Sequence, residues 1–178
     1  PLIIEHNGNR IAFIGCNIAG PPNVWVTEYN SGVNFCNLGE LEQQVQELSD
    51  NEFFTIVTFQ YFESNFMKPS DQQISYFRRM VDAGADIVSG SQSHVPMTME
   101  IYQGRFIHYG LGNLFFDQMD YLQTRQEFLD RVIIYDQRLV GVELKTAMLE
   151  YFAQPRPMNP EERSFLLQSA FQYFTISE

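Results

Sequence analysis

The fold is decided by the stretch FFTIVTFQYFESNFMKPSDQQISYFRRMVDAGADIVSG, residues 53–90, which predicts a strand, a helix and a second strand. The largely apolar Phe53–Phe59 is typical of a strand buried on both faces. Ser70 can cap the helix, Gln73 completes a capping-box pattern, and Gly84 stands where the helix should end. The helix then buries a stripe formed by Ile74, Phe77, Met80 and Val81. This order predicts a βαβ unit with parallel strands and a right-handed crossover.

The sequence on either side of this unit predicts further strands and helices. Asn7-Gly8 is a strong hairpin dipeptide between two short strands. The other predicted elements are a loop from Gly20 to Gly32, a helix from Leu38, an antiparallel pair Phe128–Tyr135 and Leu139–Phe152, and a last helix from Asn159-Pro160 to about Phe174. The predicted fold class is therefore α/β with mixed strand pairing.

Composition narrows the classes of partner. The formal net charge of −11 disfavours nucleic acid and anionic membrane, since both bind basic patches. The chain shows neither an apolar run of about 18 residues, as a membrane span requires, nor a basic-then-apolar leader. Cys16 and Cys36 either form one disulfide or remain buried thiols, and their spacing predicts no metal site.

Two polar segments follow the two predicted parallel strands. Gln60-Tyr61-Phe62-Glu63 comes directly after the first strand, and Ser91-Gln92-Ser93-His94 comes after the second. We expect both segments to be loops at one edge of the sheet, because ligands collect where parallel strands end. The sequence therefore predicts a site at this edge, with Gln60, Tyr61 and Gln92 as candidate substrate-binding residues.

His94 is the one histidine of three that falls at this predicted edge. His6 adjoins a hairpin turn and is predicted to be a surface residue. His108 shares a strand face with Phe106, so a structural role is predicted for it. His94 is accordingly the candidate catalytic and metal-ligating histidine, against the simpler interpretation of a hydrogen-bonded loop residue.

A second hairpin brings more polar residues to the same edge. MEIYQGRFIHYG turns at Gln103-Gly104 and is followed by GLGN, in which Gly112 permits close backbone approach and Asn113 can donate or accept hydrogen bonds. Gly112 is a candidate substrate-binding residue and Asn113 a candidate catalytic one. Glu100 and Asp117 flank the hairpin; either they orient a ligating histidine or they are turn and strand-edge carboxylates.

The segment that contains these residues resembles a known protein family. PSDQQISYFRRMVDAGADIVSGSQSHVPMTMEIYQGRFIHYGLGNLFFDQ is similar to the C-terminal half of the CapA/PgsA family, which comprises bacterial capsule-synthesis proteins associated with poly-γ-glutamate. The similarity runs from about Phe53 to Gln118 and is looser near both ends of the chain. It implies a calcineurin-like metallophosphoesterase fold, a mixed-sheet sandwich covered by helices. It also implies one CapA-like domain over residues 1–178, with the family's N-terminal half outside this chain.

The departures from the family pattern bear on chemistry. The family has a His-Trp-Gly stretch where Gln60-Tyr61-Phe62 stands, and a His-x-His where Gln92-Ser93-His94 stands. An amide oxygen is a poorer ligand than imidazole for transition metals, although hard cations accept it. The resemblance also assigns Gly-Asp and Asn-His ligands to the N-terminal half. We therefore expect a degenerate centre, with a divalent metal (Mn, Fe or Zn) as cofactor only if the site is active.

Three functions remain open from the sequence. The first is a CapA-like protein of the cell envelope or extracellular space, associated with capsule or poly-γ-glutamate synthesis, export or anchoring. The second is a metal-dependent phosphoesterase completed by an N-terminal segment, with His94 as ligand or transition-state donor and Asn113 positioning phosphate. The third is a non-catalytic polymer- or glycan-binding module with Tyr61 and Phe62 as contacts. The expected partners are the protein's own N-terminal half or other capsule-synthesis proteins, with an anionic polymer or phosphoester as ligand.

Overall fold

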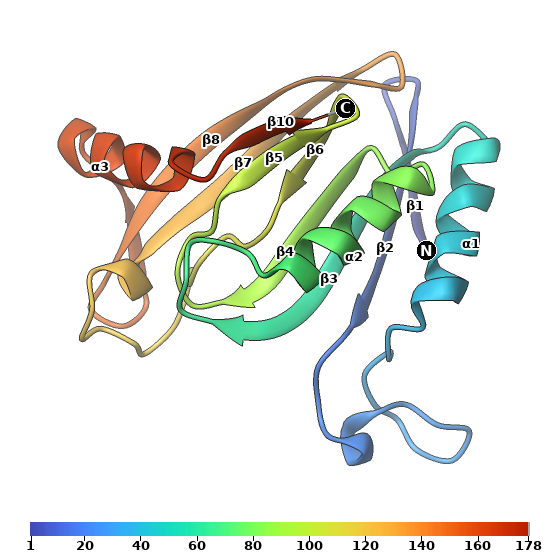
Figure 1. The fold of residues 1–178 in the computed structure, drawn as a ribbon, viewed down its shortest axis with the longest axis horizontal. Helices are drawn as coiled ribbons and strands as arrows, with labels where there is room; N and C mark the ends of the chain where they lie inside the picture. Colours follow the sequence, from blue (N-terminus) through green and yellow to red (C-terminus); the bar gives the residue numbers. More distant parts are fainter. Residues whose placement is uncertain (178) are drawn as a thin grey trace.

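The computed structural model describes residues 1–177, which form two β-sheets and three α-helices (Figure 1). The strands of the large sheet are β1 (Leu2–His6), β2 (Asn9–Asn17), β3 (Phe54–Ser64), β4 (Ile87–Ser93), β5 (Met99–Tyr102), β6 (Arg105–His108) and β10 (Thr175–Ser177). The small sheet comprises β7 (Gln126–Tyr135), β8 (Arg138–Glu150) and β9 (Gln154–Pro157). The helices are α1 (Leu38–Asp50), α2 (Asp71–Asp82) and α3 (Pro160–Phe171). The predicted α/β class with mixed pairing is confirmed.

The large sheet has the order β1-β2-β3-β4-β6-β5-β10, and its central strands β2, β3, β4 and β6 are parallel. The predicted βαβ unit is confirmed as β3-α2-β4. Both predicted hairpin turns are also confirmed. Asn7 and Gly8 have φ angles of 47° and 78°, and Gln103 and Gly104 have φ angles of 48° and 74°. Two successive positive φ angles are the signature of a type I′ turn.

Helices α1 and α2 lie side by side on one face of the large sheet (Figure 1). Leu41, Val45 and Leu48 form the buried stripe of α1, as its spacing predicts. In α2, Phe77 is fully buried and stacks between Phe59 and Tyr109, with ring centroids 4.9 and 5.3 Å away. This aromatic layer packs α2 against β3 and the segment that follows β6.

The opposite face of the large sheet is covered by the small sheet and α3. Phe128 of β7 and Leu166 and Ala170 of α3 are buried in one cluster with residues of the large sheet. His108 is fully buried there, between Phe106 and Phe128, and its Nδ1 lies 2.6 Å from Asp130 Oδ2. The predicted structural role of His108 on the Phe106 face is confirmed.

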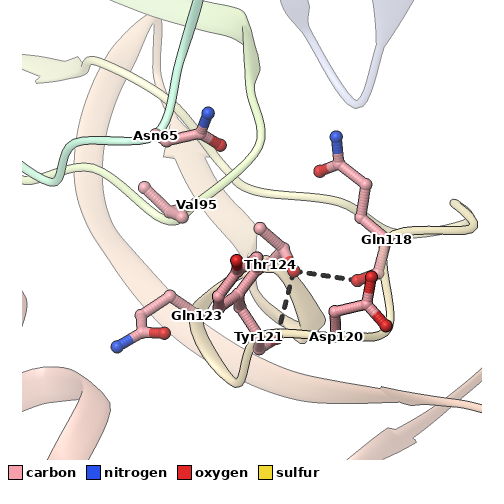
Figure 2. A pocket seen from close by; sticks show the side chains of 7 residues that line it. All are labelled: Asn65, Val95, Gln118, Asp120, Tyr121, Gln123 and Thr124. Carbon is pink, nitrogen blue, oxygen red and sulfur yellow. Dashed lines mark hydrogen bonds between the residues drawn. The ribbon is translucent and has the colours of Figure 1, made fainter.

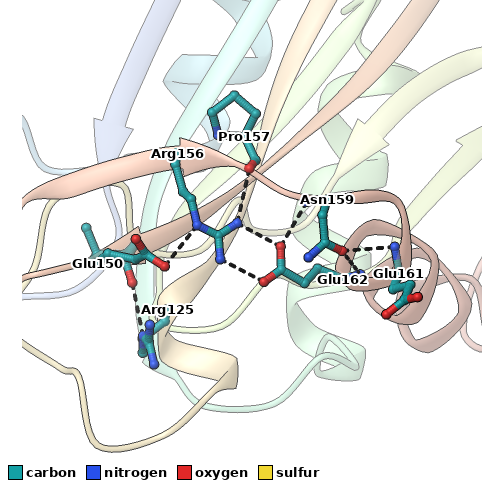
Figure 3. Close-up of polar contacts among 8 residues, drawn as sticks. Arg125, Glu150, Arg156, Pro157, Asn159, Glu161 and Glu162 are labelled. Carbon is teal, nitrogen blue, oxygen red and sulfur yellow. Dashed lines mark hydrogen bonds and ion pairs between the residues drawn. The ribbon is translucent and has the colours of Figure 1, made fainter.

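Arg156 ties α3 to the small sheet (Figure 3). Its guanidinium donates to Glu150 Oε1 at 2.9 Å and to both Glu162 oxygens at 2.7 Å. Asn159 caps α3 through a full capping box with Glu162, as its position before Pro160 suggests. Hydrogen bonds from the Arg156 guanidinium and from the backbone N–H of Asn159 hold the pKa of Glu162 down at about 2.

Several local predictions need correction. Ser70 caps α2, but the Gln73 side chain does not complete a capping box; it is buried and donates to the Tyr109 carbonyl at 2.8 Å. Helix α3 ends at Phe171 rather than Phe174. Cys16 and Cys36, whose pairing the sequence left open, are joined by a disulfide with Cα atoms 5.0 Å apart.

No helix within residues 1–177 has the length and apolarity to span a bilayer.

Candidate functional site at the carboxyl ends of β3 and β4

The polar segments after the predicted strands lie at one edge of the sheet, but all of their residues except His94 belong to strands rather than loops. Strand β3 continues to Ser64 and β4 to Ser93, with a register irregularity between Gln60 and Ser64. Gln92 has a φ angle of 79°, which is rare for a residue other than glycine and is typical of functional or bulged positions. The irregular strand ends bring the amides of Gln60 and Gln92 together.

These amides form a hydrogen-bonded row. Gln60 Nε2 donates to Gln92 Oε1, and the Ser91 hydroxyl donates to Gln60 Oε1 at 2.7 Å. Gln92 Nε2 in turn donates to Glu63 Oε1 at 3.3 Å. We call Gln60, Ser91, Gln92 and Glu63 the amide row. Each amide is oriented by its neighbour, so the row presents a fixed pattern of donors and acceptors.

His94 stands beside this row and is held by Asn113. Its Nδ1 lies 3.2 Å from Asn113 Oδ1, while Asn113 Nδ2 donates to the Thr124 carbonyl at 3.0 Å. Because Nδ2 is used as a donor, Oδ1 must accept, which assigns the proton to Nδ1 of His94. The ring packs against Phe116 with centroids 5.2 Å apart, and Nε2 faces Glu63 Oε1 at 4.0 Å. Only Nε2 of this histidine is available to a ligand.

The donor set of residues 1–177 does not by itself fit a two-metal centre. The candidate ligands near the row are one imidazole nitrogen and one exposed carboxylate, Glu63, and the amides of Gln60 and Gln92 are bonded to each other. Within residues 1–177, no three histidine, cysteine, aspartate or glutamate side chains are grouped closely enough to hold a metal ion. A zinc or manganese centre is built from such groups.

The family model for the bacterial capsule synthesis protein PGA_cap matches residues 1–118. The chain belongs to this family. The match starts earlier than the resemblance predicts, since it includes β1 and β2, and it ends at the same residue, Gln118. It contains the amide row, His94 and Asn113.

Named relatives agree with this membership. The capsule biosynthesis protein CapA of Bacillus anthracis is 34% identical over 116 residues, 63% of this chain and 28% of that protein. The PGA biosynthesis protein CapA of Bacillus subtilis is 46% identical over 61 residues, 34% of this chain and 16% of that protein. A probable polyglutamine synthesis accessory protein of Mycobacterium tuberculosis is 44% identical over 41 residues, 23% and 11% of the two chains. The matches thus cover less than a third of each relative.

Within this PGA_cap chain, Glu100 forms its hydrogen bonds away from His94, so the strand-edge alternative describes it better. Its carboxylate accepts hydrogen bonds from Arg78, from the Tyr109 hydroxyl at 2.5 Å and from the Ser177 hydroxyl at 2.7 Å. Burial raises the pKa of Glu100, but the Arg78, Tyr109 and Ser177 hydrogen bonds outweigh it and leave the pKa below its usual value. Glu100 joins α2, β5 and β10 rather than contacting His94.

Three further candidates differ in how far they are buried. Tyr61 is largely buried under α2 and contacts Phe77, whereas Phe62 is exposed, and both line one pocket. Asp117 is exposed, and none of the side-chain hydrogen bonds of residues 1–177 involves it. Gly112 has a φ angle of 90°, and a Cβ there would meet the Gln126 carbonyl at 2.5 Å. The glycine is therefore required by packing against β7.

The sequence did not indicate the cavity beside His94 (Figure 2). It has a volume of about 590 Å³ and is lined by Asn65, Val95 and residues of the Gln118–Thr124 segment. The Thr124 hydroxyl bonds the Gln118 and Tyr121 carbonyls at 2.8 and 3.0 Å, which sets the shape of this segment. Asn113 also donates to Gln118, so the wall of the cavity is continuous with the His94–Asn113 pair. A polar, aperiodic segment gives no sequence signal for such a cavity.

Proposed function

We propose that this protein takes part in the synthesis, export or anchoring of poly-γ-glutamate or a related capsule polymer at the cell envelope. Membership of the PGA_cap family and the names of the two Bacillus relatives support this role. We further propose that the carboxyl edge of the sheet is a degenerate centre, which contacts polymer and does not hydrolyse it.

The amide row is the observation that carries this proposal. Gln60 and Gln92 stand where the resemblance implies metal-ligating histidines. Their side-chain amides are hydrogen-bonded to each other. A pair of fixed amides can hydrogen-bond the peptide groups of a polymer backbone without any metal. A hydrolytic centre would instead need groups that activate water and stabilise developing charge.

The charge of the protein bears on how a polyanion would bind. The formal net charge is −11, and the amide row contains Glu63 but no basic side chain. Like charges repel, and salt screens that repulsion over about 10 Å at 0.1 M ionic strength. Binding of poly-γ-glutamate should therefore strengthen as ionic strength rises, the reverse of binding to a basic patch.

A complementation assay tests the proposal. In a strain from which the gene has been deleted, the wild-type gene should restore cell-attached polymer, measured as glutamate released by acid hydrolysis of washed cells. The double variant Gln60→Ala, Gln92→Ala should restore less than half as much. Gln43→Ala, which removes an exposed glutamine of α1, is the matched control and should restore the wild-type level.

Two results would count against it. Full restoration of cell-attached polymer by the double variant would show that the amide row is not needed for the function. Turnover of an aryl phosphodiester that is lost in His94→Ala would favour the phosphoesterase hypothesis instead.

A further inference from the structure

The cavity beside His94 has the lining of a site for a hydrophilic ligand. Six of its seven lining residues carry an amide, a hydroxyl or a carboxylate: Asn65, Gln118, Asp120, Tyr121, Gln123 and Thr124. Pockets for apolar small molecules are lined mainly by hydrophobic side chains, and ligand pockets run from about 300 to 1,000 Å³. A volume of about 590 Å³ is thus ample for a small ligand, and the lining indicates a polar one.

Some polar side chains that line this cavity form no hydrogen bond with the rest of the described protein. Gln118 accepts from Asn113 through its oxygen, and the Thr124 hydroxyl is bonded to two carbonyls. The side chains of Asn65, Asp120 and Gln123 make no hydrogen bond to other described residues. Three polar side chains on two separate segments therefore remain free to bind a ligand. Figure 2 shows these side chains among those that line the cavity.

The charge of the lining selects against anions. Among the described residues 1–177, no lysine, arginine or histidine lines the cavity, and Asp120 contributes a negative charge. A carboxylate or phosphate ligand would be desolvated without a compensating cation, which is unfavourable. The ligand should therefore be uncharged, which separates this cavity from any contact with an anionic polymer.

An aromatic ring completes the lining. Tyr121 is 70% exposed, although its segment is held by the Thr124 hydrogen bonds. An exposed ring on a fixed segment offers an apolar face together with a polar hydroxyl. A sugar has a matching character, because its hydroxyls lie around the edge of the ring and its C–H groups form an apolar face.

We infer that this cavity binds an uncharged saccharide, with Tyr121 packing on the sugar face and Asn65, Asp120 and Gln123 hydrogen-bonding its hydroxyls. This goes beyond the proposed role in capsule polymer synthesis and uses residues outside the amide row. It would give the protein a contact with a neutral envelope glycan next to its polymer site.

Isothermal titration calorimetry on the natural protein that carries residues 1–178 tests this inference. The probes are a panel of neutral trisaccharides containing glucose, galactose, mannose or N-acetylglucosamine, with oligo-γ-glutamate as the anionic comparison. At least one neutral trisaccharide should bind saturably, and Tyr121→Ala should raise its Kd about tenfold, or about 1.4 kcal/mol. The double variant Asn65→Ala, Gln123→Ala should weaken binding to a similar degree.

Tyr135→Ala is the matched control, since Tyr135 is 75% exposed at the far end of β7 and should leave the Kd unchanged. The inference is overturned if no trisaccharide of the panel binds, or if binding is indifferent to Tyr121→Ala and to the double variant. Saccharide binding and polymer retention depend on different residues, so one can fail while the other holds.

Discussion

At the scale of single residues, the chain contains a buried carboxylate without a partner. Glu127 of β7 is 1% exposed, and neither carboxylate oxygen has a hydrogen bond among residues 1–177. Burial raises the pKa of Glu127 to about 7. A carboxyl group with a raised pKa stabilises the folded state while protonated and destabilises it once charged.

Glu127 should make the stability of the protein depend on pH in a defined window. The folded pKa lies above the unfolded one, so its stabilising contribution is complete below about pH 4.3 and is lost as the pH rises through about 7. Glu127→Gln should remove this slope and raise the free energy of unfolding at pH 8 by roughly 3 kcal/mol relative to wild type. Urea unfolding of both proteins at pH 5, 6, 7 and 8 measures it. Parallel pH profiles for the two proteins would show that Glu127 is not the titrating group.

At the scale of elements, α3 depends on the ion pairs of Arg156 (Figure 3). Arg156→Ala should lower the Tm by a few degrees at pH 7, because α3 loses its bidentate contact through Glu162. Glu162 has a depressed folded pKa of about 2, so this contribution is present above its unfolded pKa and disappears as the pH falls toward 2. Calorimetric scans from pH 7 down to pH 3 should show the two Tm values converging.

Arg131→Ala is the matched control, since Arg131 pairs with Glu143 on the exposed surface of the small sheet. Isolated surface pairs contribute little to stability, so this variant should keep the wild-type Tm. An equal loss in both variants would mean that Arg156 acts only as one surface charge among others.

Elements were predictable wherever a local signal was strong. The Asn-Gly and Gln-Gly turns, the Ser70 and Asn159 caps and the stripe of α1 are all where their short patterns indicate. The prediction failed where tertiary contacts override local chemistry. Gln73 stands at the capping-box position, yet its side chain donates a hydrogen bond to the Tyr109 carbonyl instead. Gln60 was predicted to be in a loop, yet it belongs to strand β3.

The site was predictable only in part for the same reason. His94, Asn113, Gln60 and Gln92 meet at one edge because parallel strands end together, which the order of elements implies. The partners of Glu100 were not predictable, because nothing local shows that Arg78 of α2 and Ser177 of β10 reach it. The cavity escaped prediction altogether, since its lining comes from two loop segments and one residue after β4.

At the scale of the whole molecule, the central claim is that a PGA_cap fold carries amides where the resemblance implies metal ligands. The fold places the row and His94 at the carboxyl edge of a parallel sheet, where the resemblance implies the ligands of the C-terminal half. Family membership and metal chemistry are therefore separate questions in this protein.

The metal content of the longest natural form of the protein tests that claim most directly. The purified protein, exchanged into buffer with excess Mn²⁺, Fe²⁺ or Zn²⁺ and then desalted, should retain well under one metal ion per chain by inductively coupled plasma mass spectrometry. The double variant Gln60→His, Gln92→His should retain more, because imidazole is the better ligand for these ions. One or two tightly held ions per wild-type chain, lost in His94→Ala, would contradict the account.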